Sequence, residues 1–298
     1  MQKVLVLTCL ILQTLAMIPF LDYKNMCVGK KNCYAIFTDS RVSNLMGIDY
    51  TSIERYPWII PAYTNAQMNI GWAQSHSMAF SYRIWNSYYN KFGQPYPDQE
   101  VIAELSFVKV VLENNFTSCK SPKLLYPANT NSSLIHMPLF YSRDYIHRVY
   151  NRPAFNYNAG DVARWCDLKA LKAENVTGIK STLFTGYDNY LLRTPITFNV
   201  LSNMIKVLGI GLVAVPHDKQ IAELYPSYPS GFYKLTGPMM YYYPANVVGC
   251  YVPGNGTIYL LVYMFGAQNY EVNYLFVDFS MVSLKNWITM IYRVENFS

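Results

Sequence analysis

The segment with the strongest chemical signal is NAQMNIGWAQSHSMAF, residues 65–80. A small, polar loop leads through a glycine into an apolar-periodic run that begins at Trp72 and predicts a helix. A helix N-terminus carries partial positive charge and free N–H groups, so it stabilises an anionic nucleophile placed there. The residue at that point is Gly71, which has no side chain to react. The segment therefore has the frame of an active site without a reactive atom.

A second chemistry in this segment would use Ser75, His76 and Ser77. A serine hydrolase needs a hydroxyl, a histidine base bonded to it and an acid that orients the imidazole. Neighbouring residues of one helix point apart and do not face each other. We therefore expect these three side chains to be ordinary helix residues.

The first residues, MQKVLVLTCLILQTLA (1–16), combine one early lysine, a compact apolar run and small residues. This pattern is typical of a secretory signal peptide. The run is shorter than the roughly 20 apolar residues that a membrane span needs. No later segment is apolar for long enough, so we expect no membrane span after signal cleavage. The predicted location is extracellular or the endolysosomal lumen.

Cysteines in a secreted chain are expected to form disulfides. Cys27 and Cys33 flank a Gly-Lys-Lys turn and are predicted to close a small loop. Cys250 lies in an apolar run and is predicted to be a buried free thiol. The sequence contains no closely spaced cysteine pair of the zinc type and no His-Glu-x-x-His, so we expect neither a metal site nor a cofactor.

Composition and charge narrow the class of partner. The chain is 52% hydrophobic and 14% charged, which suits a folded core and excludes a disordered chain. Its net charge of +6 is scattered, with the densest cluster at Lys30-Lys31, so no nucleic-acid surface is predicted. Sequons predict glycosylation in a secreted chain. They lie at Asn115, Asn131, Asn175 and Asn255.

The order of predicted elements indicates an α+β fold. Helices are expected from Trp72 to about Gly93, over 100–113 and over 141–150, after an extended segment at 57–64. Strands are expected over 209–215, 247–252, 257–265 and 274–282, with Pro253-Gly-Asn-Gly256 as a hairpin turn. Helices followed by an antiparallel sheet predict two packed lobes with a cleft between them.

Four segments resemble papain-like cysteine peptidases, and cathepsin B in particular. They are WAQSHSMAFSYRIW (72–85), RPAF (152–155), YPSGFYKLTGPMM (228–240) and NGTIYLLVYMFG (255–266). The resemblance covers roughly residues 52–298 and implies a papain-like domain there, after the predicted signal peptide (1–16) and a short N-terminal segment (17–51). That domain would have a helical N-terminal lobe and an antiparallel β C-terminal lobe.

The resemblance also implies that the catalytic positions have been lost. The family needs a cysteine thiolate, a histidine base, an asparagine that orients it and a glutamine that stabilises the oxyanion. The nucleophile position falls on Gly71 and the glutamine position on Asn65. The histidine position falls on Tyr243 and the asparagine position on Met264. Tyr243 and Met264 would then fill the space of the missing imidazole and amide.

A family disulfide is implied between Cys119 and Cys166, which would tie the long loop of the first lobe. The resemblance thus predicts a secreted, catalytically inactive, cathepsin B-like protein that binds a peptide or protein at the inter-lobe cleft. Two alternatives stay open. One is an active cysteine-type peptidase or other hydrolase with relocated catalytic residues, and the other is a structural or storage glycoprotein.

Overall fold

The computed structural model describes residues 26–39, 71–94, 148–150, 181–191, 196–217, 231–235, 237–239, 241–265, 272–282 and 287–294. Several predicted features lie outside these residues. They are the signal peptide (1–16), the extended segment 57–64, the helix over 100–113 and the cysteines Cys119 and Cys166.

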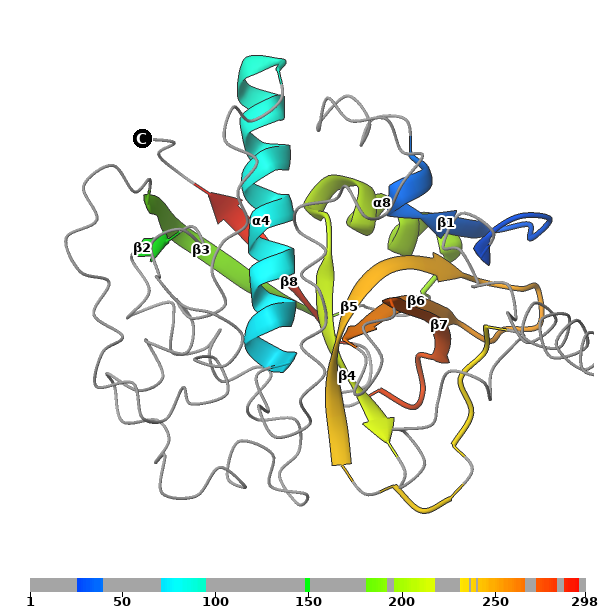
Figure 1. The fold of residues 1–298 in the computed structure, drawn as a ribbon. Coiled ribbons are helices and arrows are strands. Elements are labelled where there is room, and N and C mark those ends of the chain that lie inside the picture. The colour runs from blue at the N-terminus through cyan, green and yellow to red at the C-terminus, as the bar shows by residue number, and fades with distance from the viewer. Residues whose placement is uncertain are drawn as a thin grey trace, which may run out of the picture.

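The described elements confirm the α+β class (Figure 1). The helices are α4 (Gly71–Phe92) and α8 (Phe198–Leu208), with a 3-10 turn, η1 (Ile36–Thr38). The strands are β1 (Cys33–Ala35), β2 (Arg148–Tyr150), β3 (Ser181–Leu191), β4 (Gly211–His217), β5 (Tyr241–Tyr251), β6 (Tyr259–Phe265), β7 (Val272–Asp278) and β8 (Trp287–Val294).

Within the described residues the strands form one 8-stranded sheet in the order β2-β3-β8-β4-β5-β6-β7, with β1 paired to β5. Every ladder is antiparallel. One edge of β5 pairs with β4 along its first part and with β1 along its last part, and the other edge pairs with β6. Strand β5 therefore links the N-terminal segment to the C-terminal sheet.

The segment Ser75–Tyr82 of helix α4 is buried on all sides, in agreement with the buried helix that the sequence predicts here. Every side chain from Ser75 to Tyr82 is buried, which is the pattern of a helix surrounded by protein. It contacts β4, β5 and β8, and Figure 1 shows it standing across the sheet. The helix ends at Phe92, where Gly93 adopts φ 68° and donates its N–H to the Tyr89 carbonyl at 2.7 Å.

The predicted hairpin is confirmed. Tyr251 of β5 pairs with Tyr259 of β6 on either side of the turn, and Gly256 in the turn has φ 85°. The predicted strand 274–282 ends at Asp278, because residues 279–282 turn away from the ladder. The predicted strand 209–215 begins at Gly211, because Gly209 caps the preceding helix with its N–H on the Ile205 carbonyl at 2.8 Å.

The helix predicted over 141–150 is wrong in its described part. Residues Arg148–Tyr150 form β2, and Tyr150 pairs with Ser181 at the start of β3. Valine and tyrosine favour an extended, pleated environment when a partner strand is present. That partner lies about thirty residues further along the chain, so a local pattern contained no sign of it.

Helix α8 and strands β3 and β8 were not anticipated from the sequence. The sequence did contain signals for α8, namely a threonine before its first residue and a glycine after its last turn. In the structure Thr197 is the N-cap, and its side chain accepts the N–H of Val200 at 3.3 Å. Its buried residues, Leu201, Ser202, Ile205 and Leu208, have helical spacing. The helix is directly followed by the apolar run after Gly209, whose pattern is typical of a buried strand.

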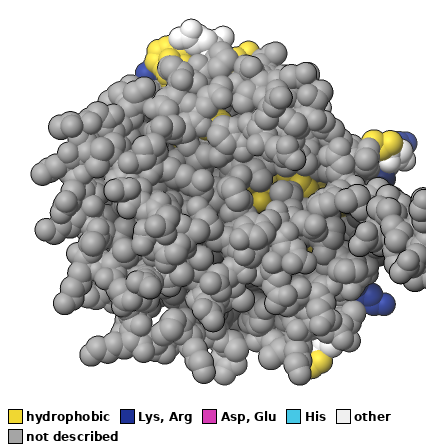
Figure 2. Space-filling model, in the orientation of Figure 1, with side chains coloured by type: hydrophobic (Ala, Val, Ile, Leu, Met, Phe, Trp, Pro, Cys, Tyr) yellow, Lys and Arg dark blue, Asp and Glu magenta, His cyan; other side chains and the backbone are white. Residues whose placement is uncertain are grey.

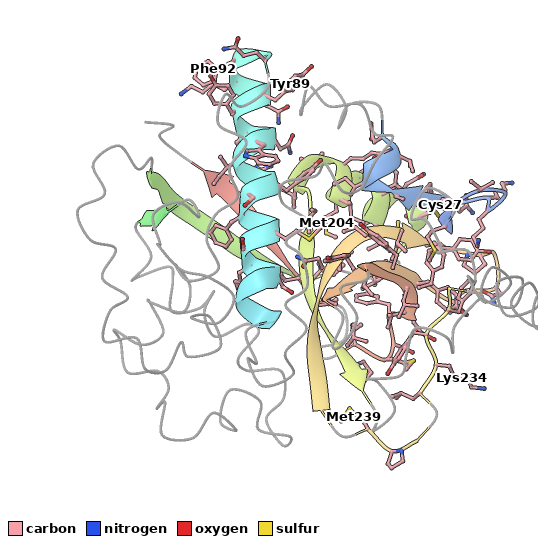
Figure 3. All side chains as sticks on the ribbon, in the orientation of Figure 1. Cys27, Tyr89, Phe92, Met204, Lys234 and Met239 are labelled. Carbon is pink, nitrogen blue, oxygen red and sulfur yellow. A yellow bond between two sulfur atoms is a disulfide. The ribbon has the colours of Figure 1, made fainter. Side chains whose placement is uncertain are left out.

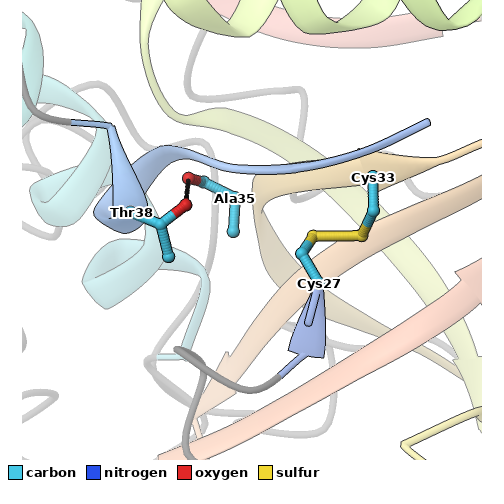
Figure 4. Close-up of a disulfide and its surroundings, with 4 residues drawn as sticks. All are labelled: Cys27, Cys33, Ala35 and Thr38. Atoms are coloured by element: carbon cyan, nitrogen blue, oxygen red, sulfur yellow. Dashed lines mark hydrogen bonds between the residues drawn. A yellow bond between two sulfur atoms is a disulfide. The ribbon is translucent and has the colours of Figure 1, made fainter. Parts of the chain in front are cut away.

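The disulfide between Cys27 and Cys33 is confirmed (Figure 4). After β1 the chain turns through η1, where the Thr38 hydroxyl donates to the Ala35 carbonyl at 2.8 Å. Ala35 and Ile36 are buried, and Lys30 places its ammonium 5.7 Å from the ring centroid of Phe276. Residues 26–39 are thus part of the packed sheet structure.

Candidate functional site

The positions that the family resemblance singles out lie on neighbouring elements. Gly71 is the first residue of α4. Tyr243 lies in β5 opposite Val215, and Met264 lies in β6 opposite Asn273. Strands β5 and β6 are paired, and both contact α4. For these three positions the structure describes the backbone, and Asn65 lies outside the described residues.

One buried hydrogen bond joins the helix to the central strand. Asn246 of β5 donates its side-chain amide to the carbonyl oxygen of Ser75 in α4 at 2.9 Å, and both residues are completely buried. Ser75 stands one helical turn after Gly71, and Asn246 stands three residues after Tyr243. The bond therefore ties the start of α4 to the middle of β5.

The figures agree with this arrangement. In Figure 3, Tyr89 and Phe92 mark the upper end of α4, so Gly71 begins the helix at its lower end. Met239, which precedes β5 by two residues, lies on the same lower side. The element that carries Gly71 thus packs with its first turns against the strand that carries Tyr243.

Asn246 was missed by sequence reasoning, although a signal for it was present. It is a single amide inside the apolar run Ala245–Cys250. Among the described residues, Ser75 Oγ and Asn246 Oδ1 find no hydrogen-bond partner, although both atoms are buried. A buried polar atom without a partner lowers the free energy of unfolding by about 1–3 kcal/mol, so these two atoms destabilise the contact between α4 and β5. An amide in a run of buried apolar residues is a sign of such a junction.

Ser75, His76 and Ser77 lie in the protein interior, and each is 0% exposed. A substrate cannot reach a side chain with no exposed surface. All three are buried residues of α4, in agreement with the expectation that they are ordinary helix residues.

The cysteines that the structure describes are not in a reactive state. Cys27 and Cys33 are bonded to each other, and Cys250 is free and buried, as predicted. Burial raises the pKa of the Cys250 thiol from 9.0 to about 12, against a smaller opposing effect of the Lys206 charge. Cysteine chemistry needs the thiolate, so Cys250 is inert at neutral pH in the folded protein.

We expect Cys250 to resist alkylation in the native protein and to react on unfolding. An unfolded thiol ionises above pH 9.0, while the folded thiol stays neutral up to about pH 12. The stability contributed by Cys250 is therefore fully present below pH 9.0 and is lost between pH 9.0 and about 12. Iodoacetamide labelling mapped to Cys250 with and without urea tests the first point. The variant Cys250→Ala should lose this part of the alkaline destabilisation, and rapid labelling of native Cys250 at neutral pH would contradict its burial.

Of the four predicted glycosylation sites, the structure describes one. Asn255 is exposed in the turn between β5 and β6, while Asn115, Asn131 and Asn175 lie outside the described residues. No cluster of His, Cys, Asp and Glu with metal-binding geometry occurs in the described part of the chain. Neither described helix has the length and apolarity of a membrane span. On the face drawn in Figure 2, the lysine and arginine side chains that the structure describes are exposed at separate places.

No family model matches the sequence, and no curated protein matches it. Two solved structures of SERA5E from Plasmodium falciparum are similar. One has a TM-score of 0.46 and 13% sequence identity, with 82% of this chain and 93% of that chain covered. The other, a high-resolution structure, has a TM-score of 0.44 and 13% identity, with 87% and 99% covered.

Proposed function

We propose that this chain is a secreted papain-like protein of the cathepsin B type that has lost catalysis and binds a peptide or protein between two lobes. One observation carries the proposal. Gly71, a residue without a side chain, is the first residue of a buried helix that packs on an antiparallel sheet. In a cysteine peptidase of this family the nucleophile would stand at that point.

The support from the site is chemical. The histidine and asparagine positions carry Tyr243 and Met264, which can neither accept a thiol proton at neutral pH nor orient an imidazole. Burial removes Ser75, His76, Ser77 and Cys250 from the surface of the described part. The buried bond between Asn246 and Ser75 holds α4 against β5, and this packing needs no reactive group at the three positions. The core of a protein stabilises its fold, whereas a few side chains carry out catalysis. Catalysis can therefore be lost while the fold is kept.

We expect the purified mature protein to show no turnover of dipeptidyl or Arg-Arg fluorogenic substrates and no labelling by an epoxide that traps reactive cysteines. The variant Gly71→Cys should gain labelling but no efficient turnover, because a thiol without a base stays mostly protonated near its free pKa of about 8.5. Any measurable turnover should require Tyr243→His as well, with Met264→Asn as the orienting change.

Matched outcomes separate the proposal from its alternatives. Epoxide labelling of any residue of the wild-type protein, located by peptide mapping, would establish a relocated active site. Equal turnover by Gly71→Cys alone and by the triple variant would show that Tyr243 is not the histidine position.

Truncation of Tyr243 and Met264 to alanine tests the cleft. If these two side chains form a binding surface, the truncated protein should lose its partner with little change in melting temperature. If they only fill buried space, each truncation should lower the free energy of unfolding by about 2–5 kcal/mol.

A further inference from the structure

The turn between β5 and β6 exposes an asparagine that is followed by a glycine. Gly254, Asn255 and Gly256 are all exposed, and they form the tip of the hairpin. Gly256 has φ 85°, and a Cβ atom built on it would meet no heavy atom within 4 Å apart from those of Gly256 itself and its two chain neighbours. The attacking nitrogen therefore belongs to a residue without a side chain, in a turn whose Cβ position is not crowded by any residue beyond its chain neighbours.

The side chain of Asn255 is held in a defined direction. Its Oδ1 accepts a hydrogen bond from the backbone N–H of Thr257 at 3.1 Å, which is an Asx-turn. This bond folds the side-chain carbonyl back over the peptide that joins Asn255 to Gly256. It also polarises the carbonyl and places an N–H donor where negative charge would develop on Oδ1 during nucleophilic attack.

We propose that Asn255 is a site of spontaneous deamidation, in which the peptide nitrogen of Gly256 displaces the side-chain amide, and that N-glycosylation of the same amide nitrogen blocks it. The Gly256 nitrogen gives its proton to water or hydroxide and bonds to Cγ of Asn255. The bond from Cγ to Nδ2 then breaks, and Nδ2 takes up a proton and leaves as ammonia. Water opens the resulting cyclic imide to an aspartyl or an isoaspartyl residue.

The two fates of Nδ2 exclude each other. Asn255-Gly256-Thr257 is also a sequon, and a sugar bonded to Nδ2 occupies the nitrogen that must leave. A copy without a glycan at this position would gain a negative charge at the hairpin tip. In the isoaspartyl form the backbone of the turn also becomes longer. Exposure of the turn makes the amide accessible both to a glycosylating enzyme and to water.

The test begins with unglycosylated full-length protein incubated at neutral pH and body temperature. Peptide mapping by mass spectrometry measures aspartate and isoaspartate at Asn255 and at Asn32, an exposed loop asparagine followed by cysteine. We expect conversion at Asn255 to be faster by roughly tenfold or more, which is about 1.4 kcal/mol of activation barrier. Equal rates at the two residues would overturn the proposal.

Variants and unfolding examine the role of the turn. Gly256→Ala should slow the conversion by roughly tenfold, because its methyl group crowds the attacking nitrogen. The Asx-turn predicts that the folded protein converts at least as fast as protein unfolded in urea. A much slower folded rate would show that the turn protects Asn255 and would contradict the proposal, and this comparison does not depend on whether Gly256→Ala folds.

Protein from a glycosylating secretory host tests the competition. Copies with a glycan at Asn255 should stay intact during the incubation. Thr257→Ala removes the sequon but keeps the backbone N–H that contacts Oδ1, so this variant should deamidate at the unglycosylated rate. Identical conversion of wild-type protein and Thr257→Ala from that host would refute the protective role of the glycan.

Discussion

Replacing Gly249 by alanine is expected to lower the free energy of unfolding by about 3 kcal/mol, and to release β1 from the sheet. Gly249 lies in β5 between β1 and β6, where it pairs with Ala35 and Leu261. A Cβ atom there would overlap the carbonyl oxygen of Tyr34 and come within 3.1 Å of Ala35 Cα. Both are backbone atoms, which cannot rotate away as the end of a side chain can.

The measurement is urea unfolding combined with hydrogen exchange. We expect the backbone amides of β1 to lose protection in Gly249→Ala, because the shortest escape from the overlap is separation of β1 from β5. Gly254→Ala is the matched control, since it lies in the adjoining turn with nothing within 4 Å of its Cβ position. Its stability should change by no more than about 0.5 kcal/mol. Equal effects of the two substitutions would show that close strand approach is not what Gly249 provides.

Gly209→Ala is expected to cost a similar amount, about 3 kcal/mol, for two reasons acting together. Gly209 ends α8 with φ 94° and ψ −141°, a conformation that side chains strongly disfavour. A Cβ atom at this position would also stand 2.5 Å from Cδ1 and 2.6 Å from Cε1 of Tyr82 in α4. Tyr82 is buried, so its ring has little room to move.

A second helix end supplies the control for Gly209. Gly93 follows α4 with φ 68° and has nothing within 4 Å of its Cβ position, so Gly93→Ala should cost only the backbone strain, about 1 kcal/mol. A double-mutant cycle with Tyr82→Ala isolates the second cause. In the Tyr82→Ala background, Gly209→Ala should cost less than it does in the wild-type protein, because only its backbone strain remains. An unchanged cost in that background would mean that the contact with Tyr82 plays no part.

Features with a local cause were predictable from the sequence alone. The helix from Gly71 to Phe92 has a long periodic pattern that ends at a glycine. The bond between Cys27 and Cys33 closes a short loop, and the turn containing Asn255-Gly256 joins two apolar runs. In each case the residues that determine the structure lie within one turn, loop or helix, so a pattern in the sequence contains the physical cause.

The candidate site was predictable only as a set of positions. The sequence places a glycine before Trp72, and it places Tyr243 and Met264 at the other two positions of the family resemblance. It gave no indication that Asn246 would reach the carbonyl of Ser75, because that contact spans 171 residues. Asn246 stands out as an amide within an apolar run, but nothing in that run identifies Ser75 as its partner.

Tertiary structure decided the features that depend on distant partners. Arg148–Tyr150 became a strand because β3 pairs with it, although its local pattern had suggested a helix. Tyr34 and Gly249 have no local reason to constrain each other, yet the pairing of β1 with β5 brings their backbones so close that only a glycine fits. Side-chain periodicity records which face of an element is buried, and it contains no information on which distant strand will cover that face.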